Sequence, residues 1–471
     1  MIRLDLATIA AVVDGRLLNP ADASIVVSGS VETDSRLVTP GALFVAKPGE
    51  VTDGHLFVGK ALEAGAVAAL VQNPVADAIA QIQVGDVVLA LGRLAKHVLH
   101  ILKRDHNLKV VGITGSNGKT TTKNMLREVL STVGETVAPI ESYNNEVGAP
   151  YSMLRCDENT RYLVAEMGAG GVGSIAYLAE IARPDIAVEL KVGLAHVGEF
   201  GGIETTAAIK AELLHDLDAH SIAVLNADDG WVREMAETCT NRKVWFGTSA
   251  DADFRATDIA LTIDGTSFEL TWPDGETRRI TLKILGEHHV MNALAALSVA
   301  EQLEVPRDKA VAALEAMPLA ERWRMQLTHR EDGVTVINDA YNASPDSTKA
   351  ALQTLAQLGR SGRRTVAVLG EMAELGEFSR EQHDAIGRVV VRLNIDQLVV
   401  VGERAKLVHL GAMQEGSWDG ESQFFDEPED ALAYLREMLQ PNDIVLVKSS
   451  KSANLRHLGD ALTGETQAEV H

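Results

Sequence analysis

A short glycine-rich stretch, residues 115–121, carries side chains that suit phosphate chemistry. It reads GSNGKTT, follows the apolar run LKVVGIT and precedes residues with helical spacing. Backbone N–H groups at a helix start attract anions, a lysine can reach terminal phosphates, and a threonine hydroxyl can bind Mg²⁺. Lys119 and Thr120 therefore indicate a nucleotide site. The simpler alternative is an ordinary strand-to-helix turn with a capping residue.

The spacing of this stretch departs from the usual phosphate loop, in which a glycine lies five positions before the Gly-Lys-[Ser/Thr] end. Gly112 lies one position too early for that role, and Gly115 lies two positions too late. Spacing alone leaves three interpretations open: a damaged nucleotide site, a chance match, or a loop of another class.

The stretch resembles the ATP loop of the Mur ligase family, whose TG-x-N-GKT-[ST] pattern has its glycine shifted in the same way. Other segments similar to the family follow in the family's order over nearly the whole chain. They are TDSRLVTPGALFVAKPG to DGHLF (33–57), ESYNNEVGAP (141–150), AEMGA (165–169), AHVGEFGG (195–202), GEHHVMNALAA (286–296), NDAYNASPDS (338–347) and VLGEMAELGE (368–377). The resemblance implies an ATP-dependent ligase that forms amide bonds through an acyl phosphate.

Two of these segments, DAYNASPDS and LGEMAELG, look like the members that add D-alanyl-D-alanine to a UDP-N-acetylmuramoyl-tripeptide in peptidoglycan synthesis. The sibling that adds the third residue, lysine or diaminopimelate, typically carries a D-N-P-R or related motif, which is absent here. Folylpolyglutamate synthase lacks a first domain like that of residues 33–57. The sibling ligase and a non-catalytic nucleotide-binding scaffold stay as alternatives.

The resemblance also implies roles around ATP and Mg²⁺, with two metal ions expected. Thr120 and Glu166 would hold one ion and His196 a second, although a lone histidine is more often a surface or capping residue. Lys210 matches a lysine that CO₂ carbamylates in the family, and its simpler interpretation is a surface lysine. The expected catalytic residues are Lys119, Glu166, His196 and Lys210. The expected ATP-binding residues are Gly115, Ser116, Asn117, Gly118, Lys119, Thr120, Thr121, Asn292, Arg322 and Asp339, with Arg324 as an alternative to Arg322.

Substrate contacts are implied in the same way, and turn or loop polarity would explain each of them equally simply. The residues concerned are Ser35, Arg36, Asp53, His55, Asn144, Asn145, Tyr341 and Asn342. Lys448, Ser449 and Lys451 could meet a carboxylate or merely decorate a loop. His289 and Lys191 stand where the family usually has asparagine, which leaves the nucleotide contacts of that strip less certain than the loop.

The scaffold expected around these residues is α/β with three domains, as a length of 471 residues suggests. Apolar runs that alternate with helical segments predict parallel sheets. We expect a mixed α/β N-terminal domain for the uridine nucleotide (1–105), a central parallel-sheet ATPase-like domain (106–318) and a C-terminal Rossmann-like domain for the dipeptide (319–471). Residues 252–285 break the alternation and predict antiparallel strands joined at Asp-Gly turns.

The overall charge limits the classes of partner that the protein can bind. Forty-three basic and 66 acidic side chains give a net charge of −23, so nucleic acid and anionic membranes should be repelled. No apolar run reaches the ~18 residues of a membrane span, and the N-terminus lacks the features of a signal peptide. Cys156 and Cys239 form neither a disulfide framework nor a zinc motif. The sequence predicts a cytoplasmic monomer.

Overall fold

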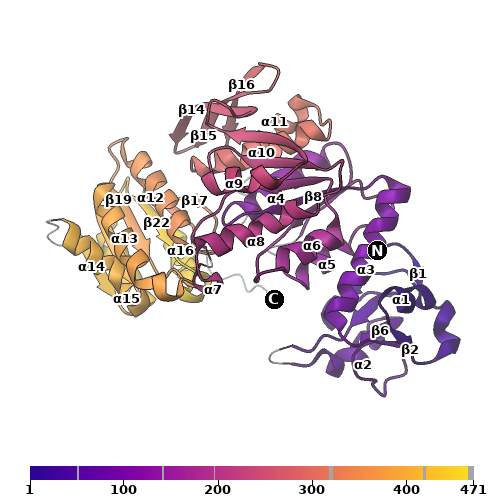
Figure 1. The fold of residues 1–471 in the computed structure, drawn as a ribbon. Coiled ribbons are helices and arrows are strands. Elements are labelled where there is room, and N and C mark those ends of the chain that lie inside the picture. Colours follow the sequence, from indigo (N-terminus) through magenta and orange to yellow (C-terminus); the bar gives the residue numbers. More distant parts are fainter. Residues whose placement is uncertain (50–51, 140–142, 196, 318–321, 417–420, 465–471) are drawn as a thin grey trace.

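The computed structural model describes residues 1–49, 52–139, 143–195, 197–317, 322–416 and 421–464. Three larger β-sheets organise these residues, each built from its own part of the chain. Figure 1 shows the N-terminal part, in indigo, and the C-terminal part, in orange to yellow, on two sides of the central part. The α/β class with several parallel sheets is confirmed.

The N-terminal part contains a five-stranded sheet in the order β2-β7-β6-β5-β4. All neighbours in it are parallel except β2 and β7. Its strands are β2 (Arg16–Leu17), β4 (Val31–Glu32), β5 (Leu43–Val45), β6 (Ala68–Val71) and β7 (Ala80–Gln83). A small antiparallel pair, β1 (Leu4–Asp5) and β3 (Val26–Val27), and the helices α1 (Leu6–Val12) and α2 (Val58–Glu63) complete it.

A single long helix, α3 (Val87–His106), leads from the N-terminal part to the central part. Asp86 caps its start by accepting from the N–H groups of Val88 and Leu89, and Asn107 ends it with φ 56°. Gly92, in the second turn of α3, lies against Tyr177, because a Cβ atom there would be 2.1 Å from the Tyr177 hydroxyl. The helix is therefore packed closely against the central part.

The central part holds a nine-stranded sheet in the order β16-β15-β14-β13-β12-β11-β8-β10-β9, parallel from β9 to β14. Its parallel strands are β8 (Lys109–Thr114), β9 (Thr136–Val137), β10 (Tyr162–Glu166), β11 (Ile186–Glu189), β12 (Ile222–Asn226) and β13 (Arg242–Gly247). Alternate residues of β8 face opposite cores: Val110 packs in one cluster, Val111 and Ile113 in another.

Helices cover both faces of this sheet. On the face of Val111 lie α4 (Lys119–Ser131), α10 (His288–Gln302) and α11 (Arg307–Ala316). On the face of Val110 lie α3, α5 (Gly148–Met153), α6 (Ser174–Ala182), α8 (Ile203–His215) and α9 (Gly230–Thr238). A parallel sheet buried on both faces explains why these strands are continuous apolar runs in the sequence.

The predicted antiparallel extension of this sheet is confirmed. Strands β14 (Phe254–Thr262), β15 (Gly265–Thr271) and β16 (Thr277–Leu282) pair antiparallel. Turns at Asp264-Gly265 and Asp274-Gly275 join them, with φ values of 146° and 87° at the two glycines. These values lie in the region that favours glycine, which is why the Asp-Gly signal was informative.

The C-terminal part has a six-stranded sheet in the order β17-β18-β22-β19-β20-β21, parallel except for β17. The four predicted strands are present as β18 (Thr335–Asn338), β19 (Thr365–Leu369), β20 (Gln397–Val401) and β22 (Ile444–Lys448). The two edge strands, β17 (Gln326–His329) and β21 (Ser422–Phe425), were not predicted, because their polar residues give little apolar signal.

Helices cover both faces of this sheet in the part of the chain that the structure describes. On one face lie α12 (Pro345–Gly359), α13 (Ser379–Arg392) and α14 (Lys406–Glu415), and on the other α15 (Pro428–Met438) and α16 (Arg456–Thr463).

In open α/β sheets, ligands bind at the carboxyl ends of the strands. The ends of β8, β10 and β11 are therefore the place to look for a site. None of the helices in the described ranges combines the length and apolar character that a membrane span requires.

Candidate active site

The glycine loop, residues 115–121, connects β8 to α4 and bends at two glycines. Gly115 and Gly118 have φ values of 149° and 89°, a region that favours glycine. A Cβ atom on Gly118 would lie only 2.4 Å from Oδ1 of Asn292 in α10. Position 118 therefore requires glycine both for its backbone bend and for its close approach to α10.

The side chain of Lys119 folds back over the glycine loop. Its Nζ donates a hydrogen bond of 2.6 Å to the carbonyl oxygen of Gly115. Burial lowers the pKa of this ammonium group, and the carboxylates of Glu166 and Glu189 act in the opposite direction. A half-buried cation at the start of a helix favours an anion beside it, as a loop that binds phosphate requires.

Glu166 ends β10, next to the strand that leads into the glycine loop, and only 1% of its surface is exposed. Its Oε1 accepts from Asn144 Nδ2 at 2.7 Å and from Thr120 Oγ1 at 3.4 Å. Its Oε2 is buried and has no hydrogen-bond partner within the described residues. A buried carboxylate oxygen without a partner fits a cation beside the Thr120 hydroxyl.

A second buried carboxylate, Glu189, ends β11 on the other side of β8. Both of its oxygens lack a hydrogen-bond partner in the part of the chain that the structure describes. Burial raises the pKa of Glu189 well above its usual value, and the charge of Lys210 opposes that shift. Sequence reasoning missed Glu189, although an acid at the end of the apolar run DIAVE was a signal for it.

Lys210 lies in α8 and is only 3% exposed, so the interpretation as a surface lysine is wrong. Burial lowers its pKa to about 7, assisted by the positive charge of Lys119, while Glu189 opposes the shift. A lysine with this pKa is largely uncharged just above neutral pH. Its amine is then available as a nucleophile or as a hydrogen-bond partner.

Asn292 lies against the glycine loop at Gly118, and His288 and His289 lie near it at the start of α10. Asn292 Nδ2 and His289 Nδ1 lie 3.2 Å apart, and the ring centres of His288 and His289 lie 4.0 Å apart with the rings tilted by 43°. Burial lowers the pKa of His288 to about 4 and that of His289 well below its usual value, so both rings are neutral. His289 Nε2 has no partner among the described residues.

Asp339 and Lys448 form a buried ion pair in the C-terminal part, with Oδ2 and Nζ 2.6 Å apart. Lys448 Nζ also donates to the carbonyl oxygen of Asn342 at 3.0 Å. The nearby ring of Tyr341 has the guanidinium of Arg324 at 4.2 Å and Lys451 Nζ at 5.9 Å. Lys448 thus has an internal carboxylate partner, while Tyr341 lies between two cations.

The two candidate arginines behave differently. Arg322 pairs with Asp460 of α16 at 2.9 Å, and its guanidinium lies over the Trp323 ring. Arg324 is close enough to Lys119 for its positive charge to lower the pKa of that lysine. This electrostatic effect on Lys119 is the reason to consider Arg324, rather than Arg322, as the arginine beside the glycine loop.

The predicted residues of the N-terminal part lie apart from the glycine loop. Ser35 begins a short helical turn, Ser35–Leu37, and Arg36 pairs with Asp34 at 2.6 Å on the surface. His55 Nδ1 lies 2.7 Å from Asp53 Oδ1, and its Nε2 accepts from the N–H groups of Gln72 and Asn73. Figure 1 draws α2 and β6, which neighbour these residues, well away from α4.

Two further predicted residues need separate mention. Asn145 Oδ1 accepts from the N–H of Gly148 at 2.8 Å, so it holds the start of α5, whereas Asn144 reaches Glu166. His196 lies outside the described residues, and its metal role stays a prediction.

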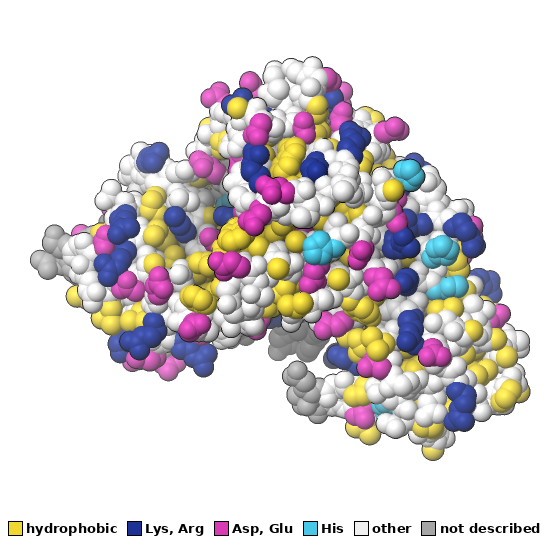
Figure 2. All heavy atoms as spheres, viewed as in Figure 1, with side chains coloured by type: hydrophobic (Ala, Val, Ile, Leu, Met, Phe, Trp, Pro, Cys, Tyr) yellow, Lys and Arg dark blue, Asp and Glu magenta, His cyan; other side chains and the backbone are white. Residues whose placement is uncertain are grey.

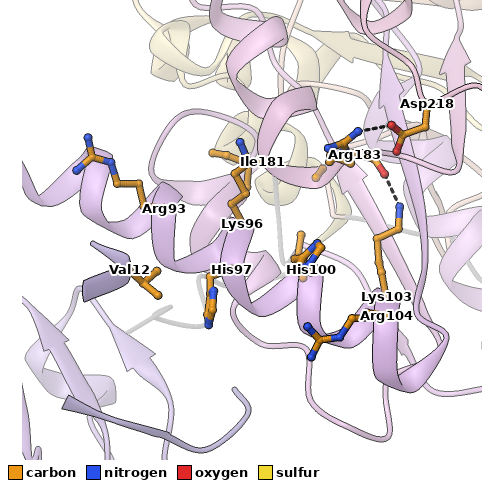
Figure 3. Close-up of a pocket in the computed structure, with 12 residues that line it drawn as sticks. Val12, Arg93, Lys96, His97, His100, Lys103, Arg104, Ile181, Arg183 and Asp218 are labelled. Atoms are coloured by element: carbon orange, nitrogen blue, oxygen red, sulfur yellow. Dashed lines mark hydrogen bonds and ion pairs between the residues drawn. The ribbon is translucent and has the colours of Figure 1, made fainter. Parts of the chain in front are cut away.

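A hollow of about 660 Å³ lies elsewhere, between α3 and the end of α6 (Figure 3). Its lining is rich in cations, but most are matched by carboxylates: Lys96 pairs with Glu180, Arg183 with Asp218, and Lys103 with Asp185. Figure 2 shows dark blue and magenta side chains intermixed over the molecule as a whole, seen from the side of Figure 1. The hollow contains none of the loop residues and is not the candidate site.

Comparisons with known proteins identify the family of this chain. Sequence models described as Mur ligase family, catalytic domain; Mur ligase middle domain; and Mur ligase, glutamate ligase domain match residues 29–99, 113–300 and 323–451. The UDP-N-acetylmuramoyl-tripeptide–D-alanyl-D-alanine ligase of Mycobacterium tuberculosis is 42% identical, over 99% of this chain and 98% of that enzyme. This chain belongs to the Mur ligase family. The resemblance found in the sequence is confirmed.

Other Mur ligases extend the comparison. The enzyme of the same name from Bacillus subtilis is 34% identical over 97% of this chain and 98% of its own length. A crystal structure of MurF from Acinetobacter baumannii superposes with a TM-score of 0.89 at 31% identity, covering 98% of this chain and 99% of its own. MurF ligase from Thermotoga maritima in complex with ADP gives 0.82 at 28%, covering 93% and 98%. The three-domain Mur ligase fold is thus present here.

We expect Gly118→Ala to weaken ADP binding at least tenfold, measured by calorimetry. The added Cβ meets Asn292, and φ 89° is strained for alanine. Gly275→Ala is the matched control, because its φ of 87° carries the same backbone strain in open space at a distant turn. Unchanged ADP affinity in Gly118→Ala would contradict the role given to the loop.

Proposed function

We propose that this chain joins D-alanyl-D-alanine to a UDP-N-acetylmuramoyl-tripeptide, using ATP, during cytoplasmic synthesis of peptidoglycan precursors. The observation that carries the proposal is the 42% identity, over 99% of the chain, to an enzyme of that activity. The intact glycine loop and the buried acids beside it support catalysis and argue against a non-catalytic scaffold. ATP use accords with the family and with the ADP complex of the Thermotoga maritima ligase.

The reaction needs activation of a carboxylate, because oxide is a poor leaving group. Transfer of the γ-phosphoryl group of ATP to a carboxylate oxygen of the tripeptide gives an acyl phosphate and ADP. The amine of the dipeptide then attacks the carbonyl carbon, phosphate leaves with the electrons of the C–O bond, and the amine loses a proton. Positioning and charge stabilisation dominate such phosphoryl transfers. The start of α4 and Lys119 would hold the β- and γ-phosphates.

Mg²⁺ fits the acids beside the loop. Thr120 and Glu166 would hold it, since Glu166 Oε2 is buried without a partner among the described residues and the Thr120 hydroxyl is adjacent. Within the described ranges, no three His, Cys, Asp or Glu side chains converge on one point. That suits Mg²⁺, which uses one or two carboxylates and completes its shell with water and phosphate oxygens. When bound, the ion would neutralise charge on the phosphates.

A carbamate on Lys210 is the second part of the proposal. The neutral Nζ attacks the carbon of CO₂, one C=O electron pair moves to oxygen, and the released proton goes to solvent. Burial, which lowers the Lys210 pKa to about 7, supplies the neutral amine that this step requires. The product would place an anion beside Glu189, and a cation between the two groups would favour the ionised form of both. His196 would belong to the same second metal.

The substrates are assigned to the outer domains. We place the uridine nucleotide on the domain of residues 1–105, with Ser35, Arg36, Asp53 and His55 as its predicted contacts. The dipeptide is placed on the domain of residues 319–471, near Tyr341 and Asn342. The central domain, 106–318, holds ATP, with Asn292 towards the adenine and Asp339 towards the ribose. A monomer is sufficient for this arrangement.

Release of phosphate from ATP should require both substrates. We expect little release with the tripeptide nucleotide or D-alanyl-D-alanine alone, and strong release with both, followed by coupled phosphate detection. A parallel assay tests the sibling activity. It uses lysine or diaminopimelate in place of the dipeptide, together with the UDP-N-acetylmuramoyl nucleotide that lacks the third residue. Equal release without the dipeptide would rule out the assigned amine donor.

Glu166→Ala should remove turnover, by 100-fold or more, while the unfolding temperature stays close to that of the wild type. The reason is that the variant loses the carboxylate placed to hold Mg²⁺, a charge-stabilising part of the reaction. Glu158→Ala is the control, because it removes an exposed acid just before β10. Wild-type turnover in Glu166→Ala would refute the metal role.

Lys210→Ala should lose most activity and recover part of it with a short carboxylic acid in the buffer. In the wild type, ¹³CO₂ should give a carbamate signal by ¹³C NMR that is absent from Lys210→Ala. Because the lowered pKa is about 7, the signal should weaken as the pH falls below 7 and the amine becomes protonated. A fully active Lys210→Ala enzyme would refute the carbamate proposal. Lys349→Ala is the control, because Lys349 lies on the exposed face of α12.

A further inference from the structure

The segment that follows β11 belongs to the central sheet by sequence but packs into the C-terminal part. Val197, in the short helix α7 (Val197–Phe200), is 1% exposed and joins the buried cluster of Leu352 and Leu375. The N–H of Gly198 donates to the carbonyl oxygen of Glu374 at 3.2 Å. A Cβ atom on Gly198 would lie 2.2 Å from the backbone nitrogen of Gly376. This contact leaves no space for a side chain.

The same segment begins with bonds to the glycine loop. The N–H of Ser116 donates to the carbonyl oxygen of Lys191 at 2.7 Å. The N–H of Gly193 donates to Ser116 Oγ at 2.8 Å, and that hydroxyl donates to the Gly193 carbonyl oxygen at 3.2 Å. The segment is thus held by the glycine loop at one end and by the C-terminal part at the other.

The first turn of α12 completes this connection. Asp346 Oδ2 accepts from the N–H of Leu194 at 2.8 Å, and a Cβ atom on Gly193 would lie 2.3 Å from the same oxygen. Ser344, which caps α12, donates from Oγ to Asn117 Oδ1 of the glycine loop at 3.3 Å. One helix start therefore contacts both the loop and the segment bound to it.

The hydrogen bond from the Leu194 N–H to Asp346 is suited to hold residues 192–195 in place. A carboxylate that accepts from a backbone N–H makes a short, charge-assisted hydrogen bond. The acid sits in the first turn of a 15-residue helix, where the helix dipole favours negative charge. Leu194 in turn lies next to Gly193, which is bonded to the glycine loop.

We infer that Asp346 is a positioning residue: through its bond to Leu194, docking of the C-terminal domain sets the geometry of the glycine loop. The inference rests on the proposed function for its kinetic readout but not for its structural one. Asp346 touches neither substrate nor reacting atoms in this assignment; it acts through residues 192–195 and Ser116. A displacement of about 1 Å at reacting groups can lower a rate by about 10²-fold.

The test compares Asp346→Ala with Asp346→Asn, whose amide oxygen can still accept from Leu194. We expect Asp346→Ala to lower kcat ten- to 100-fold with the KM for ATP changed less than threefold, and Asp346→Asn to stay within threefold of the wild type. Hydrogen exchange at the Leu194 amide, followed without substrates, should speed up at least tenfold in Asp346→Ala only. Glu429→Ala is the matched control, since Glu429 is exposed and holds the same second position, after proline, in α15.

Several outcomes would overturn the inference. They are wild-type kcat or unchanged Leu194 exchange in Asp346→Ala, an equal loss in Asp346→Asn, or the same loss in Glu429→Ala. If Asp346→Ala does not fold, Gly198→Ala tests the same coupling, because it pushes the segment away from Gly376 and should lower kcat likewise. If the wild type makes no product with the dipeptide, the proposed function fails, whereas the exchange experiment still decides the role of Asp346.

Discussion

Burial of charge without full compensation is the constraint on which this site depends. Glu166, Glu189 and Lys210 are buried around the end of β8, Lys119 beside them is half-buried, and three of the carboxylate oxygens have no partner in the described structure. Isolated buried charges are costly, so proteins keep them only where something compensates. The compensation expected here comes from outside the chain, as phosphate beside the lysines and a cation beside the acids.

The arrangement of strands explains how these charges meet. β8 lies between β10 and β11, and parallel pairing puts Glu166 opposite Ile113 and Glu189 opposite Thr114. All three strands therefore end at one edge, where the glycine loop starts α4. The apolar faces above and below this edge pack into two separate cores, which hold the strands in register. The geometry of the charges follows from the sheet rather than from flexible loops.

Much of this could be predicted from the sequence, because the signals are local. The loop shows itself through Lys119 and its glycines, the buried strands are apolar runs, and the Asp-Gly turns mark β14 to β16. Contacts between distant segments give no such signal: Ser344 and Asn117 are 227 positions apart, and Leu194 and Asp346 are 152 apart. The burial of Lys210 was not predicted, because alanines also flank lysines in helices that lie on the surface.

The long helix α3 has a mechanical consequence. Its 20 residues span about 30 Å and connect the N-terminal domain to β8 of the central sheet. The contact of Gly92 with the Tyr177 hydroxyl lies in the first third of α3, where there is no space for a side chain. Because β8 follows the carboxyl end of α3 directly, a side chain inserted at Gly92 would displace the amino end of the helix, where the N-terminal domain is attached. The position of the first domain relative to the glycine loop thus depends on a contact that lies outside the loop.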